Sequence, residues 1–129
     1  MLKRHLYSIL FFLWLGGVTF ASLFSFSNQT ESKIWFPHLD KIIHFSFYFG
    51  VVFFGSLALR EHSKMVNTKK IVLKLIVFAI FYGLLIEFLQ YVMPFNRSAE
   101  IWDAVANSSG AIIAGLLIVK CGSLIPQLK

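Results

Sequence analysis

The stretch LIEFLQYVMPFNRSAEIWDAVANSSGA (Leu85–Ala111) joins the end of one apolar run to the start of the next. Among its polar residues are the carboxylates Glu87 and Asp103 and the amides Gln90 and Asn107. Ionisable and amide groups are costly among lipid tails unless they find partners, so they usually face the interior of a helix bundle. The stretch therefore predicts membrane helices whose ends turn polar side chains toward one another.

The composition of the 129-residue chain is that of a membrane protein. Hydrophobic residues make up 57% and charged residues only 14%, whereas a soluble domain has roughly 25% charged residues. The mean hydropathy is +0.73. A chain this short has too small an interior for 15 Phe side chains, so lipid must cover much of its surface. We expect no nucleic-acid partner, because no basic face alternates with exposed aromatic residues.

Four apolar runs each approach the roughly 20 residues that cross a bilayer as a helix. They cover residues 6–24, 42–59, 71–93 and 101–119. Inside hydrocarbon every backbone polar group must be bonded within its own segment, and the alternating pattern of barrel strands is absent. The sequence predicts an all-α fold, in which residues 1–129 form one polytopic membrane domain with four transmembrane helices in a small bundle.

The basic residues predict the orientation. Nine of the 12 Lys and Arg residues lie near the N-terminus, around the connection at 60–74 or near the C-terminus, and the net charge is +6. Because Lys and Arg concentrate in cytoplasmic loops, we expect both termini to face the cytoplasm. The first run is longer than the apolar part of a signal peptide, so we expect a retained anchor. Glu61 and the basic connection around it are expected to form a solvated edge.

Polar side chains in the second and third spans share helix faces near the outer end. Asp40, His44 and Tyr48 are four residues apart, so they stack on one face of a helix. Glu87 and Gln90 do the same in the last turns of the third span. Both faces lie in the outer half of the predicted bundle.

The fourth span adds a third polar face at the same depth. Asp103 and Asn107 are four apart at its start, and the small residues Gly110 and Ala114 follow on that face. Small residues let a neighbouring helix approach closely. We expect the three faces to line one outward-facing, water-accessible pocket. The aromatic residues expected to close it below are Phe47 and Tyr48.

The residue types in this predicted pocket suit acid–base chemistry, ligand binding or helix bracing. As candidate catalytic residues, Glu87 or His44 would act as a base and Asp103 would orient His44. The candidate ligand-binding residues are Asp40, Lys41, Tyr48, Gln90, Arg97 and Asn107. The guanidinium of Arg97 is suited to a phosphate or carboxylate, or to an ion pair with Glu87 or Asp103. The alternative for each residue is a bond that only holds helices together.

We expect no metal and no cofactor from the sequence. His44, Glu87 and Asp103 are suitable ligand types, but no compact motif such as HExxH connects them. The single cysteine, Cys121, excludes an intrachain disulfide and supplies no zinc-binding spacing.

Three motifs in order, DKIIHFSFY (40–48), EFLQ (87–90) and NRSAEIWDAVANSSGA (96–111), resemble the VanZ-like family of small bacterial membrane proteins. The resemblance runs from about Asp40 to Gly115, and the first span carries no motif. The family is named for a member associated with low-level resistance to the glycopeptide teicoplanin. The resemblance implies a multi-pass protein of the bacterial cytoplasmic (inner) membrane with a role in the cell envelope.

Three functions follow from the residues and the resemblance together. In the first, the pocket binds a lipid headgroup or a lipid-linked cell-envelope intermediate through Arg97 and Lys41, and alters glycopeptide susceptibility. In the second, the chain is an intramembrane hydrolase or transferase acting on a lipid-linked substrate. In the third, it is a structural accessory subunit. Membrane lipids are the expected partners, and the sequence leaves enzymatic activity and oligomeric state open.

Overall fold

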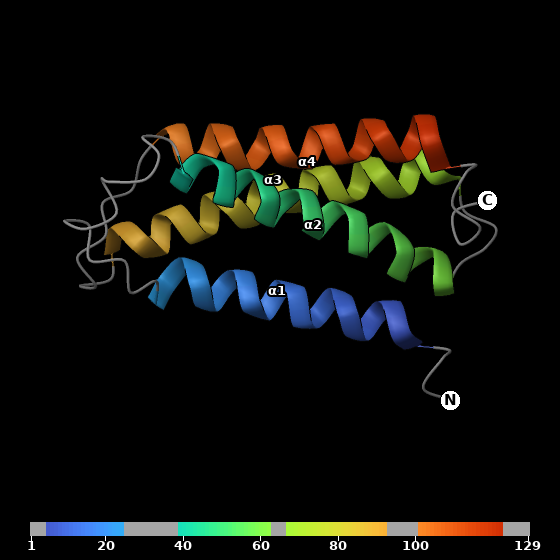
Figure 1. Cartoon of the computed structure of the whole chain (residues 1–129), viewed down its shortest axis with the longest axis horizontal. Helices are drawn as coiled ribbons and strands as arrows, with labels where there is room; N and C mark the ends of the chain where they lie inside the picture. Colours follow the sequence, from blue (N-terminus) through green and yellow to red (C-terminus); the bar gives the residue numbers. More distant parts are fainter. Residues whose placement is uncertain (1–4, 25–38, 63–66, 93–100, 123–129) are drawn as a thin grey trace.

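The chain folds into four long helices, each apolar enough to cross a membrane (Figure 1). The computed structural model describes residues 5–24, 39–62, 67–92 and 101–122, with the backbone alone at residues 24, 39 and 40. The helices are α1 (Leu6–Phe24), α2 (Leu39–His62), α3 (Thr68–Val92) and α4 (Ile101–Cys121). The described ranges contain no strand. The predicted all-α membrane fold with four spans is confirmed.

Three of the four helices extend beyond the apolar runs that predict them at one end or both, and α2 does so most. α2 begins three residues before the run at 42–59 and ends three residues after it. The polar residues at these ends, such as Lys and Arg, are good helix formers, so the helix continues past the hydrocarbon. Asn67 defines the start of α3, because its side-chain oxygen accepts a hydrogen bond from the backbone N–H of Lys69 at 2.9 Å.

The four helices run alternately up and down, and α2 is the central one (Figure 1). α2 packs most extensively along α4, α4 also packs on α3, and α1 packs mainly on α2. Only 17% of the α1 span is buried, against 50% of the α2 span. α1 begins and α4 ends at the same end of the bundle (Figure 1), as two termini on one side of a membrane require. That this side is cytoplasmic stays a prediction.

The outer surface of the bundle is strongly apolar. Phe12 of α1, Phe81 of α3 and Ile101 of α4 are 67%, 69% and 82% exposed. Side chains of this size and number would be very unfavourable in water, at about 25 cal/mol for each Å² of apolar surface. The surface is therefore matched to lipid.

Gly110 sets the close crossing of α2 and α4. A Cβ atom built on Gly110 would lie 2.2 Å from the backbone oxygen of Phe45 in α2. The next two small residues on this side of α4, Ala111 and Ala114, are fully buried. The predicted role of Gly110 and Ala114 in helix approach is confirmed, and only glycine allows this distance at position 110.

α1 is attached to α2 by polar contacts at two depths. Near the start of α1, the carboxylate of Glu61 accepts hydrogen bonds from the backbone N–H and hydroxyl of Ser8, at 3.2 and 3.1 Å. Glu61, predicted to belong to a solvated edge, is half-buried and has this additional role, because the first N–H groups of a helix need an acceptor and Glu61 supplies one. Deeper in the bundle, the indole N–H of Trp14 donates to the backbone oxygen of Phe47 at 2.8 Å.

Candidate functional site

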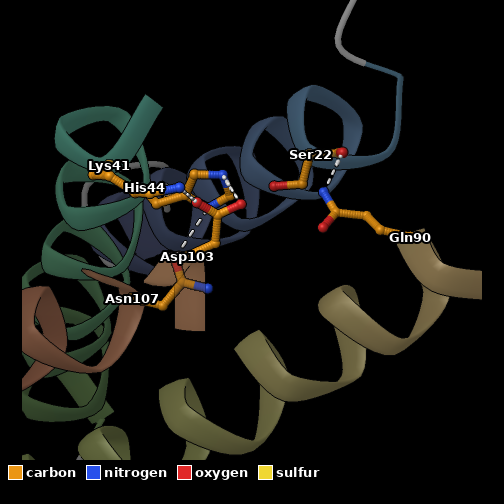
Figure 2. Close-up of polar contacts among 6 residues, drawn as sticks. All are labelled: Ser22, Lys41, His44, Gln90, Asp103 and Asn107. Atoms are coloured by element: carbon orange, nitrogen blue, oxygen red, sulfur yellow. Dashed lines mark hydrogen bonds and ion pairs between the residues drawn. The ribbon is translucent and has the colours of Figure 1, made fainter. Parts of the chain in front are cut away.

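Polar side chains from three helices meet at the end of the bundle where α2 and α4 begin and α3 ends (Figures 1 and 2). We call this group the polar cluster. It consists of Lys41 and His44 from α2, Glu87 from α3, and Asp103 and Asn107 from α4. The helical spacing explains the grouping, because His44 follows Lys41 by three residues and Asn107 follows Asp103 by four, so each pair shares a face.

Asp103 joins the two α2 side chains. Its Oδ1 accepts a hydrogen bond from Lys41 Nζ at 2.5 Å, and its Oδ2 lies 3.6 Å from Nε2 of His44 (Figure 2). The prediction that His44 pairs with a carboxylate is thus met by Asp103. The ion pair links the first turns of α2 and α4, which are far apart in the sequence.

Asn107 holds the other side of the His44 ring. Its Oδ1 lies 3.1 Å from Nδ1 of His44, and both residues are buried. An amide oxygen only accepts hydrogen bonds, so Nδ1 of His44 is the donor. A neutral His44 then carries its lone pair on Nε2, facing Asp103. In this arrangement His44 is oriented like a base or a ligand, with its reactive nitrogen turned toward carboxylate oxygens.

Most of the side chains in the polar cluster are buried inside the bundle, away from lipid and water. His44, Glu87, Asp103 and Asn107 are all less than a tenth exposed, whereas the Lys41 side chain retains 22% exposure. Charges withdrawn from water need good partners, and removing one partner of a buried pair costs about 3–5 kcal/mol. Lys41 is therefore the member best placed to meet a group arriving at the membrane surface.

Glu87 brings a second carboxylate to His44 and Asp103. One ligand atom from each of these three residues lies within 4.8 Å of the other two. The sequence predicts that the three faces carrying these residues turn toward one pocket, but only the fold gives the separation of the donor atoms. Two carboxylates and an imidazole at this separation can exchange protons through a bridging water or hold a cation.

Aromatic residues close the cluster on the side of the bundle centre. Tyr48, one turn after His44, is fully buried, and the ring of Phe47 meets that of His44 edge-on with centroids 6.3 Å apart. Gly83 of α3 provides the space, since a Cβ built on it would lie 3.2 Å from Asn107 Nδ2 and 3.3 Å from the Tyr48 ring. Among the described residues, the Tyr48 hydroxyl and Asn107 Nδ2 are buried without a hydrogen-bond partner.

Gln90 points away from the cluster and toward α1. Its amide Nε2 donates a 2.7 Å hydrogen bond to the backbone oxygen of Ser22 (Figure 2). In this structure Gln90 braces α1 against α3, and its predicted ligand contact stays a prediction. Arg97 and the side chain of Asp40 lie outside the described part of the chain, so their predicted roles also stay predictions.

The contribution of α1 was not predicted from the sequence. Besides Ser22, Thr19 of α1 bonds to the hydroxyl of Tyr82 in α3. The only signal was the presence of Thr19 and Ser22 in an otherwise apolar run, at the depth of the outer polar residues. Hydroxyl groups in membrane helices commonly bond to neighbouring helices.

Comparison with known proteins gives one match. The sequence profile of the VanZ/LLP1 family matches residues 3–124. Searches of curated proteins and of solved structures find no match. The family match includes the first helix as well as the polar motifs of the other three, and covers nearly the whole chain. With four membrane-spanning helices and a family profile that extends from residue 3 to 124, this chain is a multi-pass membrane protein that belongs to the VanZ/LLP1 family.

Proposed function

We propose that this protein binds the anionic headgroup of a membrane lipid, or of a lipid-linked cell-envelope intermediate, in an outward-facing polar pocket formed around the polar cluster. The observation that carries this proposal is the burial of His44, Glu87 and Asp103 beside the partly exposed Lys41 at one end of the bundle. Ionisable residues within membrane spans are rare because they are costly, and they usually mark a functional site.

The position of the cluster supports an anionic ligand. α2 and α4 both begin at this end, and the N-terminus of a helix presents unpaired N–H groups and a partial positive charge. Lys41 adds a positive charge that is partly exposed. Arg97, in the connection between α3 and α4, supplies a guanidinium suited to phosphate or carboxylate. The excess of Lys and Arg at the opposite end supports a location of this site on the outer side of the cytoplasmic (inner) membrane.

Native mass spectrometry of the detergent-purified protein tests this proposal by identifying co-purifying lipids. We expect the wild type to retain one class of anionic or cell-wall lipid, and Arg97→Ala and Lys41→Gln to lose it. Lys120→Gln is the matched control, since it removes the same charge from an exposed residue in the last turn of α4. If all four proteins carry the same bulk phospholipids, the binding proposal fails and a structural accessory role becomes the better explanation.

Glycopeptide susceptibility supplies a cellular readout. The family's namesake is associated with teicoplanin, and a protein that binds cell-wall intermediates would alter access to the drug's target. We expect expression in a teicoplanin-sensitive bacterium to raise the inhibitory concentration of teicoplanin, with Lys41→Gln losing the effect and Lys120→Gln keeping it. An unchanged inhibitory concentration would remove the proposed link to teicoplanin while leaving lipid binding to be judged by mass spectrometry.

The orientation of His44 favours a second candidate, an intramembrane hydrolase or transferase acting on a lipid-linked substrate. Because Asn107 accepts from Nδ1, Nε2 is the basic nitrogen of a neutral His44, and it faces Asp103. Glu87 lies within the distance that one bridging water could span in a proton relay. In an enzyme, Glu87→Gln should retain intact substrate where the wild type carries a processed form. Identical lipids on both proteins would speak against catalysis.

A further inference from the structure

We propose that His44, Glu87 and Asp103 form a binding site for a divalent transition-metal ion of the Zn²⁺ or Mn²⁺ type. This inference goes beyond headgroup binding, which needs no ion, although the two share residues. It also departs from the expectation of no metal drawn from the sequence, because the three residues are far apart in the chain and only the fold brings them together. One imidazole with two carboxylates is a donor set typical of such ions.

The separations of the donor atoms are close to those of a metal site. Three atoms no more than 4.8 Å apart share a central point at most about 2.8 Å from each, and bonds to Zn²⁺ are about 2.0–2.2 Å. His44 Nε2 and Asp103 Oδ2 are already 3.6 Å apart, near the roughly 3.4 Å expected between two ligands of a tetrahedral ion. A small rotation of the long Glu87 side chain would close the remaining distance.

The surroundings of two of the donors are those of metal ligands. A histidine ligand almost always donates its second ring N–H to an oxygen, which fixes the tautomer and the ring orientation. Asn107 Oδ1 receives this bond from His44 at 3.1 Å, and Nε2 of His44 is turned toward Asp103. Lys41 donates to Oδ1 of Asp103 at 2.5 Å. Oδ2 remains directed toward His44, so the ion pair with Lys41 is compatible with metal binding.

A second observation points to an occupant beyond these side chains. Tyr48 is fully buried one turn below His44, and its hydroxyl has no hydrogen-bond partner among the described residues. Its ring and Nδ2 of Asn107 both lie against Gly83 of α3, one turn before Glu87. Buried polar groups are nearly always satisfied, frequently by an ordered water. A water carried by the ion would provide the missing partner.

The alternative occupant is a proton. Two carboxylates and one ammonium group leave the cluster with one net negative charge when His44 is neutral, and protonation of His44 would cancel it. A protonated His44 has no lone pair for a metal. The two states therefore differ in a measurable property, namely the amount of metal that the folded protein binds.

The experiment measures metal content in a background where His44 is the only histidine. His5→Gln, His38→Gln, His62→Gln and Cys121→Ser remove the other imidazoles and the exposed thiol. The protein is purified in detergent, stripped with a chelator, equilibrated with Zn²⁺ or Mn²⁺, and analysed by elemental mass spectrometry. Circular dichroism and size-exclusion chromatography confirm that each variant is folded.

We expect one equivalent of metal per chain in the background protein. Adding His44→Gln, Glu87→Gln or Asp103→Asn should weaken binding at least about 100-fold, and Asn107→Ala, which removes only the orienting oxygen, about 10–100-fold. Glu61→Gln removes a carboxylate at the other end of the bundle and should leave metal binding unchanged.

The proposal is overturned if the background protein binds no metal, or if folded His44→Gln binds as much as the background. Either result would identify the cluster as a protonated histidine held between carboxylates. Co-purifying lipids are recorded on the same samples. A protein that binds no metal but retains the lipid would contradict the metal site alone. A protein that binds metal but retains no specific lipid would contradict the proposed headgroup binding alone.

Discussion

Replacing Gly110 with alanine should disrupt the polar cluster without altering any of its residues. The Cβ of an alanine at this position would lie 2.2 Å from the oxygen, 2.9 Å from the carbonyl carbon and 3.1 Å from the Cα of Phe45. All three atoms are backbone, so no side-chain rotation relieves the clash. Because nonbonded heavy atoms settle at about 3.5 Å, α2 and α4 must separate locally by roughly 1 Å.

This separation acts directly on the cluster. Phe45 is next to His44 in α2, and Gly110 is one turn from Asn107 in α4. Lengthening the 3.1 Å contact between His44 and Asn107 by that amount would break it. Overpacking costs about 1–3 kcal/mol and a lost buried hydrogen bond a further 1–3 kcal/mol or so. We therefore expect a loss of about 2–6 kcal/mol in the free energy of unfolding.

The assay is unfolding in mixed micelles by titration with a denaturing detergent, followed by circular dichroism. Gly17→Ala in α1 is the matched control, because no atom lies within 4 Å of its added Cβ. Alanine favours helix over glycine by up to about 1 kcal/mol, so Gly17→Ala should be neutral or stabilising. Equal stability of Gly110→Ala and Gly17→Ala would refute the argument that backbone contact at position 110 holds the cluster together.

Three further predictions concern the ion pair, the attachment of α1 and the topology. Asp103→Asn removes the charged partner of the partly exposed Lys41 and should lower the free energy of unfolding by about 1.5–3 kcal/mol; an unchanged stability would show that this ion pair does not hold α2 and α4 together. Trp14→Phe deletes the donor to the Phe47 oxygen and should cost about 0.5–1.5 kcal/mol in the same titration, whereas no change would show that this bond is dispensable. Cys121 is exposed and should react with a membrane-impermeant thiol reagent in inside-out but not right-side-out vesicles, and the opposite pattern would reverse the predicted orientation.

Several features of the site follow from local sequence. Asp103 and Asn107 share a helix face because they are four residues apart, and this holds in any fold that keeps α4 helical. Gly110 on the same side predicts a close helix crossing, and the structure confirms this prediction. Placement near one end of the bundle also follows, because Lys41 directly precedes the second apolar run and Glu87 lies in the last turns of the third, and the length of both runs matches a bilayer.

Partner choice does not follow from local sequence. From the sequence alone, His44 could form a hydrogen bond with Glu87, with Asp103 or with an amide. In the structure, Nδ1 of His44 is bonded to Asn107 and Nε2 lies near Asp103. Gln90 shares a helix face with Glu87, yet it bonds to α1 instead of the cluster. Each outcome depends on how one helix is rotated and shifted relative to another.

By itself the sequence determines the all-helical class, the four spans and the depth of the polar residues. These properties arise from the match of apolar length to the bilayer and from the need to bond every backbone group within its helix. The tertiary structure alone decides that Glu61 binds the start of α1 and that His44, Glu87 and Asp103 converge. Apolar surfaces are equally satisfied by lipid and by one another, so hydropathy cannot select the pairing of helices, which depends on close packing and interhelical hydrogen bonds between residues distant in the chain.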